Sequence, residues 1–159
     1  MLARPENLNE AHDRLVAKKR KVQRKKHLLE IRQEIRETQQ IYAEQKKPFF
    51  GLCFSKENLS ISVIETVKDF MDQGDALHHC IFTNEYYTKK NSLILSAAID
   101  NHPVETIEVS LQTLEIIQCR GPRNKYSKDH KKILNLLRKN LYQIKARIEK
   151  RKSDSPLVT

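Results

Sequence analysis

The side chains best suited to chemistry lie in one short run, Leu77-His78-His79-Cys80. Cysteine and histidine can act as nucleophile and base, or as ligands to a metal ion. Neighbouring side chains diverge on a strand or a helix, so at most two of His78, His79 and Cys80 can serve one site. Because unpaired cysteines are usually buried, a buried Cys80 with His79 hydrogen-bonded nearby is the more ordinary arrangement. If the protein is an enzyme, His79 and Cys80 are its candidate catalytic residues.

The rest of the sequence offers little support for a cofactor. Further metal ligands would have to come from Cys53, His102 or Cys119, and none lies at a spacing that zinc sites use. The three glycines form no phosphate-binding loop. Glu105 and Glu108 fall three apart on a predicted strand, so they face opposite sides and make a poor acid–base pair. We therefore expect no metal and no other cofactor.

Lysine and arginine are concentrated towards the two ends of the chain. Residues 1–47 hold 13 Lys/Arg against 7 Asp/Glu, residues 48–119 hold 4 against 10, and residues 120–152 hold 13 against 2. Within the first segment, seven of the nine positions 18–26 are basic. With a net charge of +10, this pattern favours a polyanion-binding surface. The duller alternative is that the basic ends complement the acidic middle of the same or another copy.

A second basic feature is the loop that follows the last predicted strand. The guanidinium of Arg120 and nearby backbone N–H groups can bind a phosphate there, or the loop is a plain turn in which Gly121 supplies a positive φ. Tyr126 and Tyr142 can stack on bases, or Tyr142 simply packs within the fold. The residues predicted to bind nucleic acid are Lys18, Lys19, Arg20, Lys21, Arg24, Lys25, Lys26, Arg120, Arg123, Asn124, Lys125, Lys131, Lys132, Arg138 and Lys139.

Residues 7–46 are predicted to form one long helix with a narrow apolar stripe. The stripe residues recur every seven positions, first as Leu8, Leu15, Val22 and Leu29, and then one position earlier as Leu28, Ile35 and Tyr42. This spacing is typical of a coiled-coil seam and leaves room for a homodimer through the N-terminal helix. Pro48 ends the helix.

The remainder predicts an α+β fold. Apolar and alternating runs indicate strands over residues 49–54, 59–64, 92–99, 104–110 and 114–119, with helices over 65–78, broken near Gly74, and 127–150. Short connections favour antiparallel pairing. We expect a long N-terminal helix, a small antiparallel sheet of about five strands with an inserted helix, and a basic amphipathic C-terminal helix. The predicted domains are a basic helix (1–47), an α+β module (48–150) and a disordered tail (151–159).

Three separated segments follow a recognisable pattern. Leu77, His79 and Cys80 fit L-x-H-C-V with Ile81 in place of valine, Thr106-Ile107-Glu108-Val109 fits T-x-E-V, and Gln118, Arg120, Gly121 and Asn124 fit Q-x-R-G-x-x-N. Together they resemble the PcfJ-like proteins of bacterial conjugative plasmids and mobile elements. The resemblance covers about residues 48–137 and implies the C-terminal portion of a longer family member. It implies a setting, the bacterial cytoplasm and a mobile element, rather than a reaction.

The leading hypothesis is a conjugation-associated accessory protein that binds nucleic acid, expected to be DNA, mainly through phosphate contacts. Proteins of the conjugation machinery are further expected partners. A membrane is not, because no stretch of 18 apolar residues exists. One alternative is an enzyme acting on nucleic acid or a nucleotide, with His79 or Cys80 reacting and Arg120 binding phosphate. Another is a protein-interaction scaffold whose charges only confer solubility.

Overall fold

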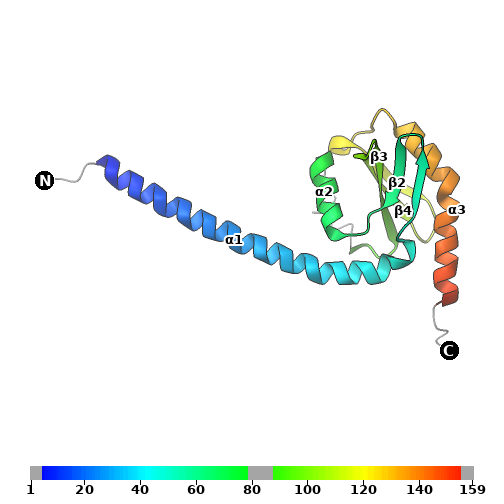
Figure 1. Cartoon of the computed structure of the whole chain (residues 1–159), viewed down its shortest axis with the longest axis horizontal. Helices are drawn as coiled ribbons and strands as arrows, with labels where there is room; N and C mark the ends of the chain where they lie inside the picture. Colours follow the sequence, from blue (N-terminus) through cyan, green and yellow to red (C-terminus); the bar gives the residue numbers. More distant parts are fainter. Residues whose placement is uncertain (1–4, 79–87, 155–159) are drawn as a thin grey trace. The chain divides into compact units, whose positions relative to one another are not determined.

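The computed structural model describes residues 5–78 and 88–154 and confirms the α+β class (Figure 1). Contacts divide the chain into two units, residues 1–37 and 38–159. The helix α1 (Pro5–Lys46) forms the first unit, and its last turns belong to the second. No glycine or proline interrupts the chain between residues 6 and 47, and Lys, Arg, Glu, Gln and Leu, which dominate there, are good helix formers.

Five antiparallel strands follow one another in the sheet in chain order. They are β1 (Cys53–Lys56), β2 (Leu59–Val63), β3 (Ser92–Ile99), β4 (His102–Ser110) and β5 (Ile116–Arg120). The helix α2 (Val67–Leu77) covers one face of the sheet, and α3 (His130–Asp154) covers the other (Figure 1). Within the described residues, no helix is both long enough and apolar enough to cross a membrane.

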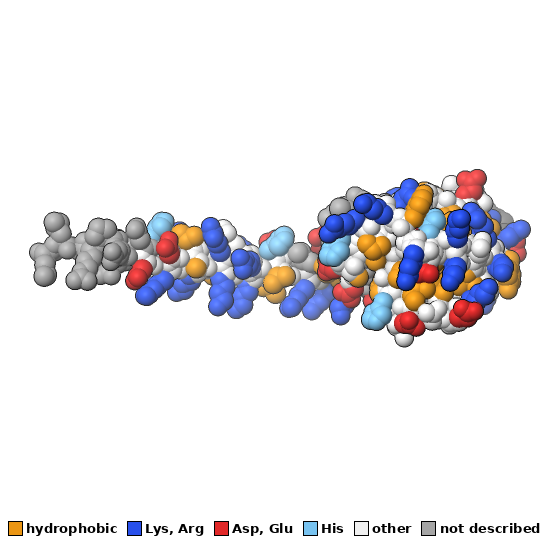
Figure 2. Space-filling view, turned by 90° about the horizontal axis from the view of Figure 1, so that it is seen from above, with side chains coloured by type: hydrophobic (Ala, Val, Ile, Leu, Met, Phe, Trp, Pro, Cys, Tyr) orange, Lys and Arg blue, Asp and Glu red, His pale blue; other side chains and the backbone are white. Residues whose placement is uncertain are grey.

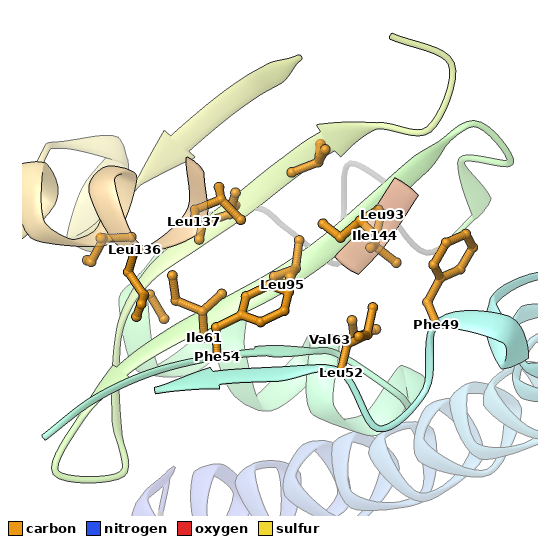
Figure 3. Close-up of a cluster of buried hydrophobic side chains, with 14 of the residues drawn as sticks. Phe49, Leu52, Phe54, Ile61, Val63, Leu93, Leu95, Leu136, Leu137 and Ile144 are labelled. Carbon is orange, nitrogen blue, oxygen red and sulfur yellow. The ribbon is translucent and has the colours of Figure 1, made fainter. Parts of the chain in front are cut away.

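The hydrophobic core lies between the sheet and α3 (Figure 3). Side chains alternate along each strand, so Ile61, Leu95 and Ile107 point to this face, where Leu137 and Ile144 of α3 meet them. Burial of each such aliphatic side chain contributes about 1.5–3 kcal/mol. The helix α3 packs mainly on β1, β2 and η1, and His130 in its first turn reaches Glu105 of β4.

The face covered by α2 is polar by comparison. Gln73 of α2 is buried there, where its Nε2 donates to Thr106 Oγ1 (2.9 Å) and its Oε1 accepts from Ser96 Oγ (2.9 Å). Thr106 and Ser96 are direct partners across β4 and β3, so both point to this face. The two faces of one sheet therefore carry different chemistry.

The predicted strand over residues 49–54 begins later than expected. Lys47–Phe49 form a short 3₁₀ helix, η1, with Pro48 in its first turn, and only Cys53 onward pairs with β2. The apolar character of this run reflects the burial of Phe49 and Leu52 in the core rather than an extended backbone. The predicted break of α2 near Gly74 is also wrong, since the helix runs through it to Leu77.

The hairpin between β3 and β4 is tighter than predicted. Asp100 and Asn101 form the whole turn, with φ values of 51° and 66°, as in a type I′ turn. The strand β4 therefore starts at His102, and Pro103 sits where the register shifts, a place that tolerates a missing N–H. At the other end of the chain, α3 continues to Asp154, four residues into the segment predicted to be a tail.

Candidate functional site

His79 and Cys80, the predicted catalytic pair, lie outside the residues that the structure describes. Their described neighbour His78 ends α2 in a left-handed conformation (φ 50°), with its N–H donating to the carbonyl of Gly74. The residues of the Q-x-R-G-x-x-N segment are all described. They lie in β5 and in the loop after it, next to a buried cluster that was not predicted from the sequence.

Gly121 opens the loop that joins β5 to α3. Its N–H donates to the carbonyl of Lys125 (2.6 Å), and a Cβ at this position would lie 2.8 Å from that oxygen and 2.9 Å from the carbonyl oxygen of Val104. Glycine is needed here because the backbones approach so closely. The positive φ expected at Gly121 is found instead at Arg123 (57°) and Asn124 (63°).

This loop closes over Glu105 of β4, whose side chain is fully buried. One carboxylate oxygen, Oε1, accepts from the thiol of Cys119 (2.9 Å) and from Nδ1 of His130 (2.6 Å). The other, Oε2, accepts from the N–H of Ser127 (3.2 Å) and from its hydroxyl. A carboxylate from β4, a thiol from β5, an imidazole from α3 and a hydroxyl from the loop thus converge.

Electrostatics favour an ionised Glu105 and a protonated Cys119. Burial by itself raises the pKa of Glu105, but hydrogen bonds from Cys119, His130 and Ser127 and the charge of His130 outweigh it, so the pKa lies below its usual range. Burial, with the neighbouring carboxylate, raises the pKa of the Cys119 thiol. By itself Cys119 is therefore not an activated nucleophile.

Tyr126 stacks on His130 of this cluster, and Arg120 lies over Tyr126. The ring of Tyr126 lies parallel to that of His130, with centroids 4.0 Å apart, and the guanidinium of Arg120 lies 4.6 Å from the Tyr126 centroid. Tyr126 thus contacts an imidazole and a guanidinium while 62% of its side chain stays exposed. The stacking of Tyr126 on a base stays a prediction.

A second buried carboxylate, Glu108, lies on the α2 face of the same strand. It accepts from Ser92 Oγ (2.6 Å) and Gln118 Nε2 (3.1 Å), and Lys89 Nζ lies 3.3 Å from Oε2. Of the motif residues, Thr106, Glu108, Gln118 and Arg120 share this face, because Thr106 pairs with Arg120 and Glu108 with Gln118. Of these four, Gln118 and Glu108 are joined by a hydrogen bond, Thr106 bonds to Gln73, and the Arg120 guanidinium lies over Tyr126.

The predicted basic residues of α1 are all exposed to solvent. Within the described residues, none of the seven between positions 18 and 26 takes part in an ion pair or a side-chain hydrogen bond. Of the stripe residues, Val22 lies within this block and Leu15 and Leu29 flank it, and they are 60%, 59% and 61% exposed. Figure 2 shows this succession of blue side chains and single orange ones along the helix.

The second unit has a basic surface of its own on α3. The predicted residues Lys131, Lys132, Arg138 and Lys139 are exposed there. A groove between α3 and the turn joining β1 to β2 is lined by lysines from both sides, among the acidic residues Glu57 and Asp129. These lysines are Lys56, Lys128, Lys132 and Lys139. Tyr142, which is 67% exposed, follows on the same helix.

The family of the chain can be stated from its comparison with known proteins. The model of the family described as PcfJ-like protein matches residues 1–134. The chain belongs to the PcfJ-like family. The match includes α1, which the motif resemblance over residues 48–137 did not. No curated protein and no solved structure matches this PcfJ-like chain.

Sequence reasoning missed most of the buried cluster in this PcfJ-like protein. Glu105 was considered only as a partner for Glu108, and Ser127 only as the start of a helix. His130 lies 25 residues from Glu105, so no local spacing could reveal their contact. The available signal was Gly121, because a glycine that follows a strand can mark a close approach of backbones.

Proposed function

We propose that this PcfJ-like protein is a mobile-element accessory protein of the bacterial cytoplasm that binds nucleic acid, DNA foremost, mainly through phosphate contacts. The observation that carries the proposal is the basic block of α1, residues 18–26, whose seven lysines and arginines are exposed and unpaired within the described residues. Proteins of the conjugation machinery are further proposed partners.

The charge density of the basic block supports a polyanion as its partner. Nine helical residues span about 13 Å, so the block carries roughly one positive charge per 2 Å of axis. Duplex DNA carries about one negative charge per 1.7 Å. Residues 14–26 include no acidic residue to neutralise the block from within the same stretch of helix. A polyanion would relieve the repulsion between like charges at i,i+4 spacing.

The groove beside α3 supports the proposal independently. Lys56 and Lys132 face the same groove from a turn and a helix, so a backbone phosphate there can be contacted from two sides. Contacts of this kind carry no base information, so we expect weak sequence preference and strong salt dependence.

Fluorescence anisotropy of labelled single- and double-stranded DNA over a salt series tests the proposal. We expect tight binding at low salt and a log–log slope of about −0.7 to −0.9 for each phosphate contacted. Substituting Lys18, Lys21 and Lys25 by Gln should weaken binding to all sequences alike and reduce the slope by about 1 for each lost contact.

A matched pair of double variants locates the second surface. Lys132→Gln with Lys139→Gln removes two charges from the groove, whereas Lys68→Gln with Lys90→Gln removes two exposed charges elsewhere in the same unit. We expect the first pair to weaken DNA binding and the second pair to leave it nearly unchanged. Absence of DNA binding at low salt, or an equal loss of DNA affinity in the two double variants, would contradict the proposal.

The stripe of α1 supports a second proposal, the pairing of two copies. Leu15, Val22 and Leu29 offer an exposed apolar seam, but two such helices bring their basic blocks together. Salt screens this repulsion, so pairing should strengthen with salt, whereas DNA binding weakens. Sedimentation velocity of the chain at low and high salt measures how pairing depends on salt. Pairing that is strongest at low salt would contradict the proposal that the stripe is the contact between the two copies.

A further inference from the structure

We infer that Glu105, Cys119 and His130 form a binding site for a divalent transition-metal ion, with Zn²⁺ as the best match. Each residue comes from a different element, β4, β5 and α3 in turn. The three ligand atoms, a carboxylate oxygen, Sγ and Nδ1, all lie within 4.8 Å of one another. Ligands on one zinc ion lie about 2.0–2.3 Å from it, so this spacing lets all three reach the same ion.

The ligand types select the metal. A thiolate and an imidazole with one carboxylate suit Zn²⁺, which accepts sulfur, nitrogen and oxygen in tetrahedral sites. Ca²⁺ and Mg²⁺ require more oxygen ligands than this cluster offers. The thiolate of Cys119 is the ligand that most clearly favours a transition metal over these harder cations.

The charge balance also fits a divalent ion. Without metal, the Cys119 thiol and the His130 ring each donate a hydrogen bond to Glu105. On binding, the thiol proton passes to solvent, and Nδ1 of His130 gives up its proton, so that the bound ring is neutral with its one proton on Nε2. The thiolate and the carboxylate then neutralise the two charges of the ion. A site without net charge suits this buried position, because an uncompensated charge is costly away from water.

The surrounding residues hold the ligands in place. Ser127 binds Oε2 of Glu105 through its N–H and its hydroxyl, which leaves Oε1 towards Cys119 and His130. Such hydrogen bonds to a ligand orient it and tune its affinity for metal. The His130 side chain is 18% exposed, so the site has access to solvent. Three protein ligands leave a fourth position for water or an exchangeable ligand.

A cobalt titration tests the site. The full chain, without an affinity tag and after treatment with a chelator, is titrated with Co²⁺ and followed by its absorption spectrum. We expect one ion per chain, a thiolate-to-cobalt charge-transfer band, and its loss when Zn²⁺ displaces Co²⁺. Zn²⁺ should also raise Tm, since a ligand that binds only the folded state stabilises it. The absence of the band, or of saturable binding, would overturn the inference.

Substitutions assign the band to this cluster. Cys119→Ser should abolish it, whereas Cys53→Ser, which removes an exposed cysteine of β1, should leave it intact. Ser127→Ala should weaken metal binding by about 10-fold or more. If circular dichroism shows that Cys119→Ser does not fold, His130→Gln takes its place, with at least a tenfold loss expected. A band that survives in a folded Cys119→Ser variant, an unchanged cobalt affinity in His130→Gln, or loss of the band in Cys53→Ser would overturn the inference.

Discussion

Glu105 and Glu108 lie three residues apart on β4 and enter two separate buried clusters on opposite faces of the sheet. Glu105 meets Cys119 and His130 on the side of α3, and Glu108 meets Ser92 on the other side. The two carboxylates therefore cannot act as an acid–base pair, as the strand periodicity predicts. Each carboxylate instead accepts hydrogen bonds from its own set of neighbouring side chains.

Replacing Glu108 by Ala should lower the free energy of unfolding by about 2–3 kcal/mol. The substitution removes the buried acceptor of Ser92 Oγ and of Gln118 Nε2, and loss of a charged acceptor is more damaging than loss of a neutral one. Urea denaturation measures the change. Glu115→Ala, which removes an exposed carboxylate close to β5, serves as the control and should change stability by less than about 0.5 kcal/mol.

Tyr42→Phe should destabilise the second unit by about 1–2 kcal/mol. Tyr42 is buried near the end of α1, and its hydroxyl donates to the carbonyl of Ile64, which would lose this donor. Tyr142→Phe makes the same chemical change at an exposed position of α3, so its effect should be close to zero. Equal thermal or urea midpoints for the two variants would contradict the role given to the Tyr42 hydroxyl.

Lys46 should make stability depend on pH in the alkaline range. Burial, with a smaller repulsion from Arg151, lowers the pKa of Lys46 from 10.5 to about 8 in the folded chain. Between these values the unfolded chain binds more protons at Lys46 than the folded chain does, so its contribution to stability rises with pH there. Urea denaturation across this range should show the rise in the wild type.

The variant Lys46→Met isolates this contribution from other groups that titrate at alkaline pH. It removes the titrating amine, whose Nζ donates to the carbonyls of Lys89 and Lys90 (both 2.9 Å). We expect the extra rise of stability to disappear in Lys46→Met and to persist in the control Lys47→Met, which changes an exposed neighbour. Parallel pH profiles for Lys46→Met and the wild type would refute the assignment.

Tyr142→Ala should weaken the binding of single-stranded DNA by about 1–3 kcal/mol and leave that of duplex DNA nearly unchanged. Tyr142 is exposed on α3 beyond the basic residues Arg138 and Lys139, so its ring can stack on an unpaired base. Bases of a duplex are already stacked and offer no such contact. Anisotropy titrations with both kinds of DNA measure the difference, and equal losses for the two would exclude stacking.

Local patterns were sufficient to predict most of the elements. The absence of glycine and proline from residues 6–47 marks α1, and apolar alternation marks the strands, because both signals act over a few neighbouring residues. The predicted ends of elements were wrong where a contact with a distant part of the chain decides them. Phe49 turns into the core instead of extending β1, and α2 continues through Gly74. A short apolar run or a glycine in a helix is ambiguous until its packing is known.

The sequence by itself determined the α+β class, the long basic helix, the opposite orientations of Glu105 and Glu108, and the family motifs. Only the tertiary structure decided that Glu105, Cys119 and His130 meet. Their separations of 14 and 25 residues along the chain are closed by strand pairing and by the docking of α3 on the core. Such a contact depends on the whole packed fold, so no spacing between these residues could encode it.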